Sequence, residues 1–171
     1  MTFTFPPQTS KDQIFKQIEE QLLSTNLSIA TFDKSRPWGG FFVIDETNIE
    51  TFIKLFFPEL NLADIKIGNK LSPKILIVEK NKRLSWQYHH RRAELWKLSG
   101  GVAGIVTSET DTEGTLQTLT MGTIIKLRQG QRHRLVGLDD WGIIAEIWQH
   151  TDNNNPSDEN DIVRVQDDFG R

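Results

Sequence analysis

The sequence lacks cysteine altogether, so disulfide bonds and thiolate metal ligands are both excluded. Any metal would have to be held by His, Asp, Glu, Gln or backbone oxygen. An excess of one charge is also missing, because the 171 residues carry a formal net charge of -3. This near-neutral balance gives no indication that nucleic acid or an anionic membrane surface is a partner.

Long hydrophobic runs are absent as well. No apolar stretch approaches the roughly 20 residues that a membrane-spanning helix needs. Residues 1–8 lack the basic region and the apolar run that begin a secretory signal. We therefore expect a cytoplasmic protein, and the length leaves room for one domain with its own hydrophobic core.

The first 73 residues are expected to contain two helices and one short strand. Ser10 is a plausible N-cap, and apolar residues recur at helical spacing from there to about residue 24. The apolar segment 41–44 predicts a strand. A capping-box pattern at 47–50 predicts a second helix that ends at Pro58. Its apolar face is formed by Ile49, Phe52, Ile53 and Phe56.

From residue 74 onward the pattern is typical of short strands separated by glycines and polar pairs. We expect strands at 74–79, 84–89, 93–98, 102–107, 115–119, 123–127, 133–136 and 142–148. Eight close strands favour a double-sheet jelly roll. Residues 161–171 carry too much charge for a core strand, but they hold apolar residues that can dock. One structural domain is expected, in which residues 1–73 pack as an arm on a barrel formed by residues 74–171.

Four residues from two parts of the chain have the number and type of ligands that a small metal site needs: Gln87, His89, Glu94 and His133. Gln87 and His89 are two apart, so they share one face of a strand. Glu94 re-enters on the neighbouring strand after a turn, and His133 follows Gly130, which permits a tight turn. Imidazole nitrogens with amide and carboxylate oxygens suit zinc, although nickel, manganese or iron also fit.

Other interpretations of these residues remain open. The His-His-Arg-Arg run at 89–92 is often only a polar hairpin, and a lone histidine such as His133 is usually a surface or core residue. His90 is expected to point away from any site that contains His89, because neighbours in a strand face opposite sides. His150 is expected beyond the last strand, facing solvent and uninvolved in the site.

Residues 84–96 resemble the first cupin motif, in which His-x-His is followed after three or four residues by Glu. Here the motif reads Gln87-x-His89 and then Glu94. With Gln first, it resembles the cupin domain of mannose-6-phosphate isomerases. The closest resemblance is to the C-terminal domain of bifunctional mannose-1-phosphate guanylyltransferase/phosphomannose isomerases, with their Leu-Ser-x-Gln-x-His-x-x-Arg-x-Glu-x-Trp run. The Arg-Pro-Trp-Gly at 36–39 and the Asp-Ile-Val-Arg at 161–164 resemble the same family, so the resemblance covers 36–44 and 74–171.

The resemblance implies an all-β fold, the double-stranded β-helix of a cupin jelly-roll barrel, with one or two added N-terminal helices. It also implies a metal-dependent aldose–ketose isomerase that interconverts mannose 6-phosphate and fructose 6-phosphate. Glu146 stands where the family has a glutamate and is the candidate base, or else a buried or rim glutamate paired with an arginine. Candidate phosphate-binding cations, which could equally be surface charges, are Arg164, Arg171, Lys126 and Arg132.

Three departures from the family pattern support an alternative function. Arg128 stands where the second motif usually has proline, Leu95 replaces a histidine beside Glu94, and residues 45–73 form an insertion. The alternative is a metal- and sugar-binding cupin that has lost catalysis and has a regulatory role. We also expect a homodimer through an exposed sheet edge, unless an N-terminal helix covers that edge.

Overall fold

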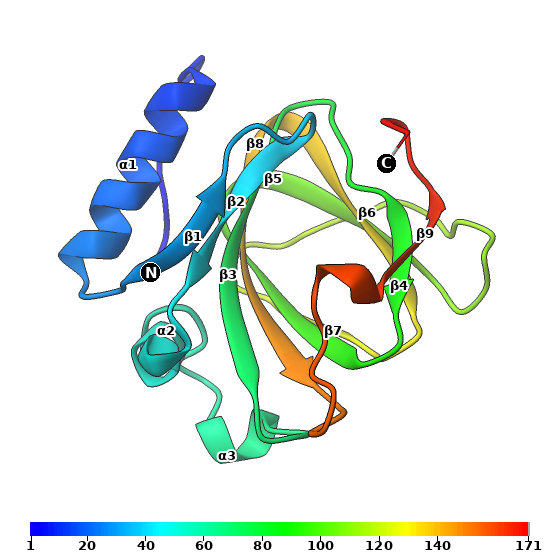
Figure 1. Cartoon of the computed structure of the whole chain (residues 1–171). Helices are drawn as coiled ribbons and strands as arrows, with labels where there is room; N and C mark the ends of the chain where they lie inside the picture. The colour runs from blue at the N-terminus through cyan, green and yellow to red at the C-terminus, as the bar shows by residue number, and fades with distance from the viewer. Residues whose placement is uncertain (171) are drawn as a thin grey trace.

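The computed structural model describes residues 1–170 and shows strands wrapped around a common interior, with the helices on one side (Figure 1). The helices and short 3-10 turns are α1 (Lys11–Ser24), η1 (Glu46–Asn48), α2 (Ile49–Phe56), α3 (Leu62–Ile65) and η2 (Glu159–Asp161). The strands are β1 (Ile29–Asp33), β2 (Gly39–Ile44), β3 (Leu71–Val78), β4 (Trp86–His89), β5 (Arg92–Ser108), β6 (Gln117–Thr118), β7 (Ile124–Leu127), β8 (Arg132–His150) and β9 (Ile162–Gln166).

Helix α1 begins and ends where its sequence predicts. Ser10 caps it, and the side chain of Gln13 accepts a hydrogen bond from the Ser10 backbone N–H at 3.1 Å, which completes a capping box. The apolar residues on one face are buried: Ile14, Phe15, Ile18 and Leu22. This face anchors the helix to the sheet, since a helix of this length is marginal in water without tertiary packing.

The second predicted helix exists, but the predicted capping box at 47–50 is wrong. The Asp45 carboxylate instead accepts hydrogen bonds from the backbone and side chain of Thr47, which opens the 3-10 turn η1. Helix α2 follows directly and ends at Phe56, with three of its four predicted apolar residues buried: Phe52, Ile53 and Phe56. The short strand β1 and the short helix α3 were not predicted.

Two pairs of predicted strands are single long strands in the structure. The segments predicted at 93–98 and 102–107 form one strand, β5, with register shifts beside Gly100 and Gly101. Gly101 has a φ of 63°, and a Cβ there would lie 1.7 Å from the Trp141 carbonyl oxygen. The glycines therefore mark bulges that bend a continuous strand. Likewise, β8 joins the segments predicted at 133–136 and 142–148.

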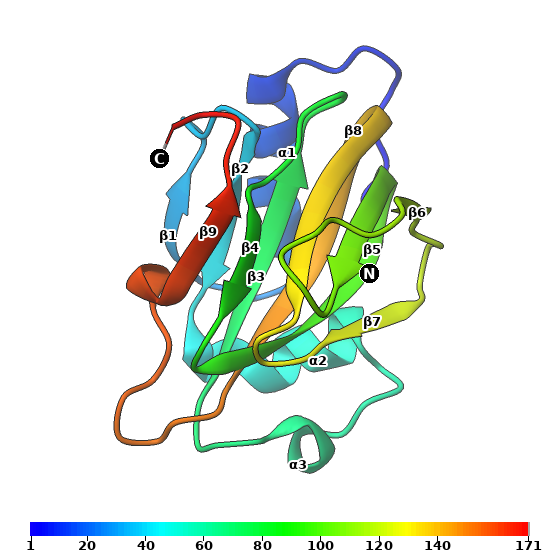
Figure 2. The same ribbon diagram turned by 90° about the vertical axis from the view of Figure 1, so that its right-hand side faces the viewer.

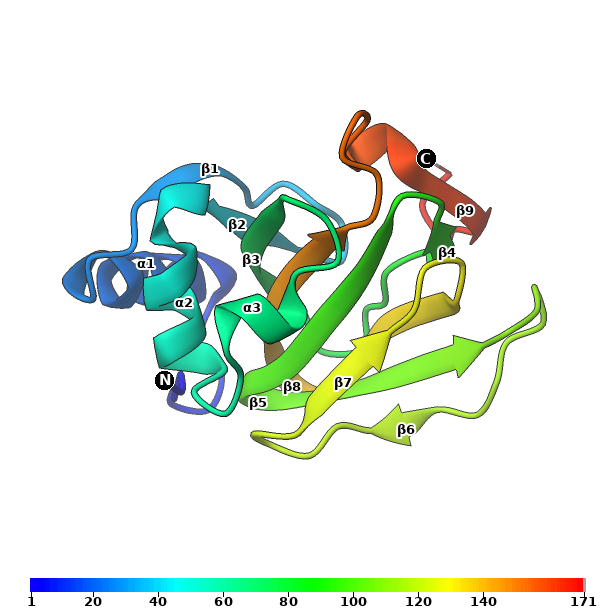
Figure 3. The ribbon, with the colours of Figure 1, turned by 90° about the horizontal axis from the view of Figure 1, so that it is seen from below.

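The antiparallel sheet has the order β1-β2-β3-β8-β4-β9, and β5 pairs with the other edge of β8 and carries β6 and β7. Because β8 pairs with β3, β4 and β5 at different points, the sheet curves around the interior (Figure 3). The charged C-terminal segment, which was not expected to be a core strand, forms β9 beside β4 (Figure 2).

Strands β3 and β8 bury both of their faces, and two separate cores result. Side chains alternate between faces along a strand. Ile75 and Ile77 join an outer core that α1 and α2 cover, whereas Leu76 and Val78 point into the barrel. The functional groups described below lie on the barrel side of this double-faced sheet.

Residues 1–73 do more than pack on the barrel, because β2 is hydrogen-bonded to β3 along five residue pairs and extends the sheet. Among the described residues only β2 pairs with β1, so the outer edge of β1 is open. Phe32 on this strand is 51% exposed. The homodimer expected to form through such an edge stays a prediction. No helix within residues 1–170 is both long enough and apolar enough to cross a membrane.

The outer core should determine the stability of the whole chain. Phe52 is fully buried and packs against Phe56 with ring centroids 4.7 Å apart. We expect Phe52→Ala to lower the free energy of unfolding by about 3–5 kcal/mol, because it leaves a cavity in a packed core. Leu23→Ala on the exposed side of α1 should change it by less than about 1 kcal/mol. Urea unfolding measures both, and a separate early transition in Phe52→Ala would show that the helices unfold independently of the barrel.

Candidate metal centre

Three strands bring His89, Glu94 and His133 together inside the barrel. His89 ends β4, Glu94 lies near the start of β5, and His133 lies at the start of β8. One ligand atom from each of the three side chains lies within 4.8 Å of the other two. All three are buried, with exposed fractions of 1% or 2%. The convergence follows from register, because Gln87 of β4 pairs directly with His133 of β8.

The two oxygens of Glu94 each face one histidine. Oε1 lies 3.1 Å from His89 Nε2, and Oε2 lies 3.2 Å from His133 Nε2. Two donors that bind one ion at about 2.0–2.2 Å, at angles between about 90° and 110°, lie roughly 2.8–3.6 Å apart. These separations therefore fit a shared cation.

The protonation of His133 also fits a metal ligand. Its Nδ1 lies 3.0 Å from the Gln131 carbonyl oxygen, which can only accept, so the proton resides on Nδ1. In the neutral ring Nε2 then carries the lone pair that a metal would bind. This buried atom has no hydrogen-bond partner among the described residues and lies 3.2 Å from Glu94 Oε2. A backbone carbonyl that orients a histidine in this way is common behind metal-ligating imidazoles.

Arg92 competes with a metal for the same atoms. Its guanidinium donates to Glu94 Oε1 at 2.7 Å and lies 3.1 Å from His89 Nε2. It also donates to the Ser157 hydroxyl and stacks 3.4 Å from the ring centroid of Trp148. A buried carboxylate needs a positive partner, and Arg92 supplies it in this arrangement.

A hydrogen-bonded bridge links Glu94 to Glu146. The Trp96 indole N–H lies 3.1 Å from Glu94 Oε2 and 2.9 Å from Glu146 Oε1. Burial first, and the charge of Glu94 second, raise the pKa of Glu146 to about 8. Burial also acts to raise the pKa of Glu94, but its contacts with His89, Arg92 and His133 outweigh it and hold the pKa well below the usual value. Two neighbouring carboxyl groups thus differ in protonation at neutral pH.

Gln87, the fourth predicted ligand, lies on the same strand as His89 and lines a pocket that opens from this cluster. Its side-chain oxygen accepts a hydrogen bond from the Ser85 hydroxyl at 2.6 Å. Its role as a ligand stays a prediction. His90 is exposed, which agrees with its expected direction away from the cluster.

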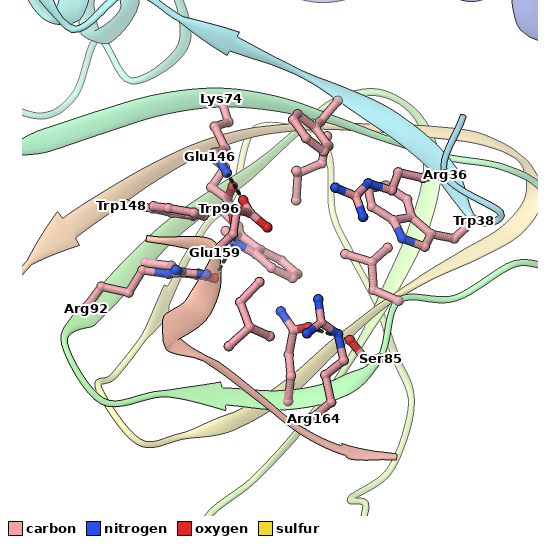
Figure 4. A pocket seen from close by; sticks show the side chains of 16 residues that line it. Arg36, Trp38, Lys74, Ser85, Arg92, Trp96, Glu146, Trp148, Glu159 and Arg164 are labelled. Carbon is pink, nitrogen blue, oxygen red and sulfur yellow. Dashed lines mark hydrogen bonds and ion pairs between the residues drawn. The ribbon is translucent and has the colours of Figure 1, made fainter. Parts of the chain in front are cut away.

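The pocket lies in the barrel interior next to the cluster and has a cavity volume of about 50 Å³. Glu94, Glu146 and Gln87 form part of its wall, whereas His89 and His133 do not line it. Figure 4 shows four cationic side chains around it: Arg36, Lys74, Arg92 and Arg164. A buried cavity lined by cations and a few acids suits a polar, negatively charged small molecule.

The predicted phosphate-binding residues divide into three groups. Arg164 of β9 lines the pocket. Lys126 is exposed on β7, and Arg132 pairs with Asp111 at 2.7 Å and stacks on Tyr88, so neither lines the pocket. This position favours the alternative that both are surface charges, and their role in phosphate binding stays a prediction. Arg171 lies outside the described residues.

The expectation that His150 faces solvent is wrong, because β8 continues through His150 and buries it to 1% exposure. Its Nε2 lies 2.8 Å from the Ser72 hydroxyl, which donates to Glu46 Oε1 at 2.5 Å. Since the one hydroxyl proton goes to Glu46, the Nε2–H of His150 donates to Ser72. Burial first, and Lys70 second, lower the pKa of His150 to about 4.

Sequence reasoning missed Lys74, Trp148 and Glu159 as parts of the pocket. Lys74 and Trp148 were assigned only to strands, although both alternate with outer-core residues and so face inward. Glu159 lies in the turn η2, and no local pattern in the sequence indicates that this turn folds back over the barrel.

The departures from the family pattern lie away from the pocket. Leu95 belongs to the outer core, on the opposite face of β5 from Glu94 and Trp96. Arg128 is exposed and pairs with Glu109. No residue between 45 and 70 lines the pocket, and α2 packs on the outer core. None of these departures therefore changes a residue that lines the pocket.

Residues 45–167 match the family described as mannose-6-phosphate isomerase C-terminal. The chain is also 29% identical over 161 residues to xanthan biosynthesis protein XanB of Xanthomonas campestris pv. campestris. That alignment covers 93% of this chain and 28% of the relative, and a second strain's protein of the same name gives the same values. The chain therefore spans about 28% of the length of the curated relatives it matches.

Solved structures share the fold at low identity. A variant of oxalate decarboxylase from Bacillus subtilis matches with a TM-score of 0.55 and 11% identity. The match covers 79% of this chain and 30% of the decarboxylase chain. Vicilin from Corylus avellana has a TM-score of 0.52 and 14% identity, with coverages of 75% and 34%. These likenesses concern the fold alone, and with the family match they confirm the expected cupin jelly-roll barrel.

Metal content should depend on the buried histidines and not on their exposed neighbour. We expect the wild type, loaded with zinc and dialysed, to retain about one ion per chain. His133→Ala should bind at least about tenfold more weakly, because it removes one of three converging ligands. His90→Ala is the matched control and should bind like the wild type. Elemental analysis measures all three, and equal metal in His133→Ala and wild type would show that these residues form no site.

The buried His150 should make stability depend on pH. Its native pKa of about 4 lies below the ordinary pKa of 6.5 for an exposed histidine. Between these values the unfolded chain binds a proton that the native chain does not, so the free energy of unfolding falls as pH falls through this window. One such group contributes a slope of up to about 1.4 kcal/mol per pH unit.

We therefore expect His150→Gln to flatten the pH dependence of unfolding between pH 6.5 and about 4. Denaturant unfolding at pH 7, 6 and 5 measures the slope. His90→Gln, at an exposed site, should leave the slope unchanged. An identical slope in His150→Gln and wild type would contradict the burial of a neutral imidazole at this position.

Proposed function

Because this chain belongs to the mannose-6-phosphate isomerase C-terminal family of cupins, we propose that it is a metal-dependent sugar-phosphate isomerase. Mannose 6-phosphate and fructose 6-phosphate are the proposed substrates. The observation that carries the proposal is the convergence of His89, Glu94 and His133 at the base of a pocket lined by cations. The same protein could act alone or as one part of a longer enzyme.

Aldose–ketose isomerisation moves a proton between two adjacent carbons through an enediol. It needs a group that takes up and returns that proton, and positive charge near the two oxygens. A divalent cation held by His89, Glu94 and His133, with Gln87 as a proposed fourth ligand, would supply the Lewis acid. Zinc is the first candidate for this nitrogen and oxygen donor set, with nickel, manganese and iron as alternatives.

Glu146 is the proposed proton-transfer residue. It lines the pocket, and the Trp96 indole joins it to Glu94 through two hydrogen bonds. A carboxyl group with a pKa of about 8 has both its acid and base forms populated near neutral pH. This is the property that general acid–base catalysis requires of a residue that must first accept and then donate a proton.

One observation favours the second candidate function, a non-catalytic sugar-binding cupin. The Arg92 guanidinium contacts both Glu94 and His89, so the cluster is already neutralised without a metal. A protein that kept Arg92 in this position would bind sugar phosphates through its cations and leave them unchanged. Metal-dependent turnover distinguishes the two candidates.

We expect the zinc-loaded wild type to interconvert mannose 6-phosphate and fructose 6-phosphate in a coupled assay. Glu146→Gln should lower kcat by about 100-fold or more, which is the usual contribution of a general acid–base group. Its metal content should not change. The control is Glu109→Gln, which alters an exposed carboxylate outside the pocket and should keep full activity.

Other hexose and heptose phosphates, and reconstitution with nickel, manganese or iron, belong in the same assay. Absence of turnover with all of them at full metal occupancy would rule out the isomerase. Thermal stabilisation by sugar phosphates without turnover would then support the binding protein, whereas no stabilisation would contradict both functions.

A further inference from the structure

Lys74 is a buried cation inside the pocket. It lies on β3, is 5% exposed, and its ammonium lies 3.4 Å from the centroid of the Trp148 ring. Moving an ammonium group out of water costs several kcal/mol unless an anion is close to it. The barrel must therefore present a negative group to Lys74 whenever no ligand is bound.

That negative group comes from the turn η2. The Glu159 carboxylate lies 2.8 Å from the Lys74 ammonium, and Figure 4 shows it reaching into the pocket from above the barrel. The Glu159 side chain is 52% exposed, so solvent can accept it when it leaves. A buried fixed cation is thus paired with a half-exposed acid that can rotate away.

The neighbours of η2 let the Glu159 side chain move without moving the turn. Asp161 is buried and accepts hydrogen bonds from the backbone N–H groups of His90 and Arg91 and from the Ser157 hydroxyl. These bonds hold the end of η2 against β4. Displacement of Glu159 therefore requires only a side-chain rotation.

The groups around Glu159 suit a larger anion than a carboxylate. Burial acts to raise the pKa of Glu159, but Lys74, followed by Arg92 and Arg36, lowers this pKa below the usual value. Three cations therefore act on the position of the Glu159 carboxylate. The guanidinium of Arg36 points into the pocket (Figure 4), and its Nε also pairs with the Asp33 carboxylate at 2.8 Å. The indole N–H groups of Trp38 and Trp148 are buried in the pocket wall without hydrogen-bond partners among the described residues. Cations with additional N–H donors match the several acceptor oxygens of a phosphate.

We propose that Lys74 and Arg36 form the phosphate subsite of the pocket, and that Glu159 occupies this subsite until a phosphate displaces it. The inference rests on the proposed function for the identity of the whole substrate, a phosphorylated sugar. The ligand chemistry itself, a tetrahedral phosphate dianion, follows from the contacts around Glu159.

The position of Lys74 relative to the metal ligands agrees with a 6-phosphate. Lys74, Glu146 and Trp96 form one row across β3, β8 and β5. Neighbouring strands lie about 4.8 Å apart, so the row spans roughly 10 Å from Lys74 to Trp96. In a hexose 6-phosphate the phosphate is at the opposite end of the carbon chain from C1 and C2. The phosphate can therefore reach Lys74 while the reacting carbons extend towards Glu94 on β5, with Glu146 on the strand between them.

Calorimetric titration of the full chain with inorganic phosphate tests the subsite without any need for turnover. We expect Glu159→Gln to bind phosphate about three- to tenfold more tightly than the wild type, because the ligand no longer has to displace a charged carboxylate. The double variant Glu159→Gln with Lys74→Met should lose this gain. Equal affinity in Glu159→Gln and wild type would overturn the proposal.

The chain offers a matched control on its outer face. Lys97 and Glu59 form a similar pair at 2.6 Å, with side-chain exposures of 12% and 45%. Glu59→Gln should leave phosphate affinity unchanged, and a gain as large as that of Glu159→Gln would show that only net charge matters. Circular dichroism checks the fold of each variant, and Glu159→Gln alone decides the result if the double variant does not fold.

Comparison of mannose 6-phosphate with unphosphorylated mannose separates this inference from the proposed function. Lys74→Met should raise the KM for mannose 6-phosphate about tenfold or more and leave the KM for unphosphorylated mannose within about twofold, because mannose has no phosphate to bind. Turnover with an unchanged KM in Lys74→Met would overturn the subsite only. Glu159-dependent phosphate binding without any turnover would support the subsite and contradict the isomerase.

Discussion

The burial of the Glu94 carboxylate is the constraint on which the barrel interior depends. A carboxylate removed from water costs several kcal/mol unless positive or N–H groups surround it. Here His89, His133, Arg92 and the Trp96 indole all face its two oxygens. Each of these groups is itself buried, so each needs hydrogen-bond or charged partners of its own deeper in the structure.

The requirement of Arg92 shapes the next layer of the interior. Its guanidinium stacks on one side of Trp148, and the Lys74 ammonium lies over the same ring. Arg92 also donates to Ser157 and to the Asp158 carbonyl oxygen, which ties the loop before η2 to the barrel. A continuous series of contacts thus leads from Glu94 through Arg92, Trp148 and Lys74 to Glu159 at the pocket. One buried charge therefore connects the proposed metal ligands with the proposed phosphate subsite.

The sequence predicted those parts of the fold and site whose determinants are local. The N-cap at Ser10 and the apolar spacing after it predicted α1, and the pattern of ligand types predicted the convergence of His89, Glu94 and His133. It did not predict the burial of His150, because whether β8 continues depends on its pairing with Arg92 of β5, more than 50 residues earlier. Glu159 was missed for a similar reason, since its contact with Lys74 joins residues 85 positions apart. Contacts between distant strands and loops leave no periodic pattern in the chain.

The two-faced strands also explain why the departures from the family pattern leave the site intact. Leu95 lies between Glu94 and Trp96 on β5, so alternation turns it to the outer core, where its strand neighbour is Ile147. That outer face is covered by α2, which belongs to the insertion at 45–73 and contributes Phe52 and Phe56 to the same core. The apolar face of a helix packs on apolar residues of the sheet, so Leu95 and the helix of the insertion contribute to the same outer core. Both stabilise the sheet from outside, and the polar interior on its other face is free to carry the chemistry.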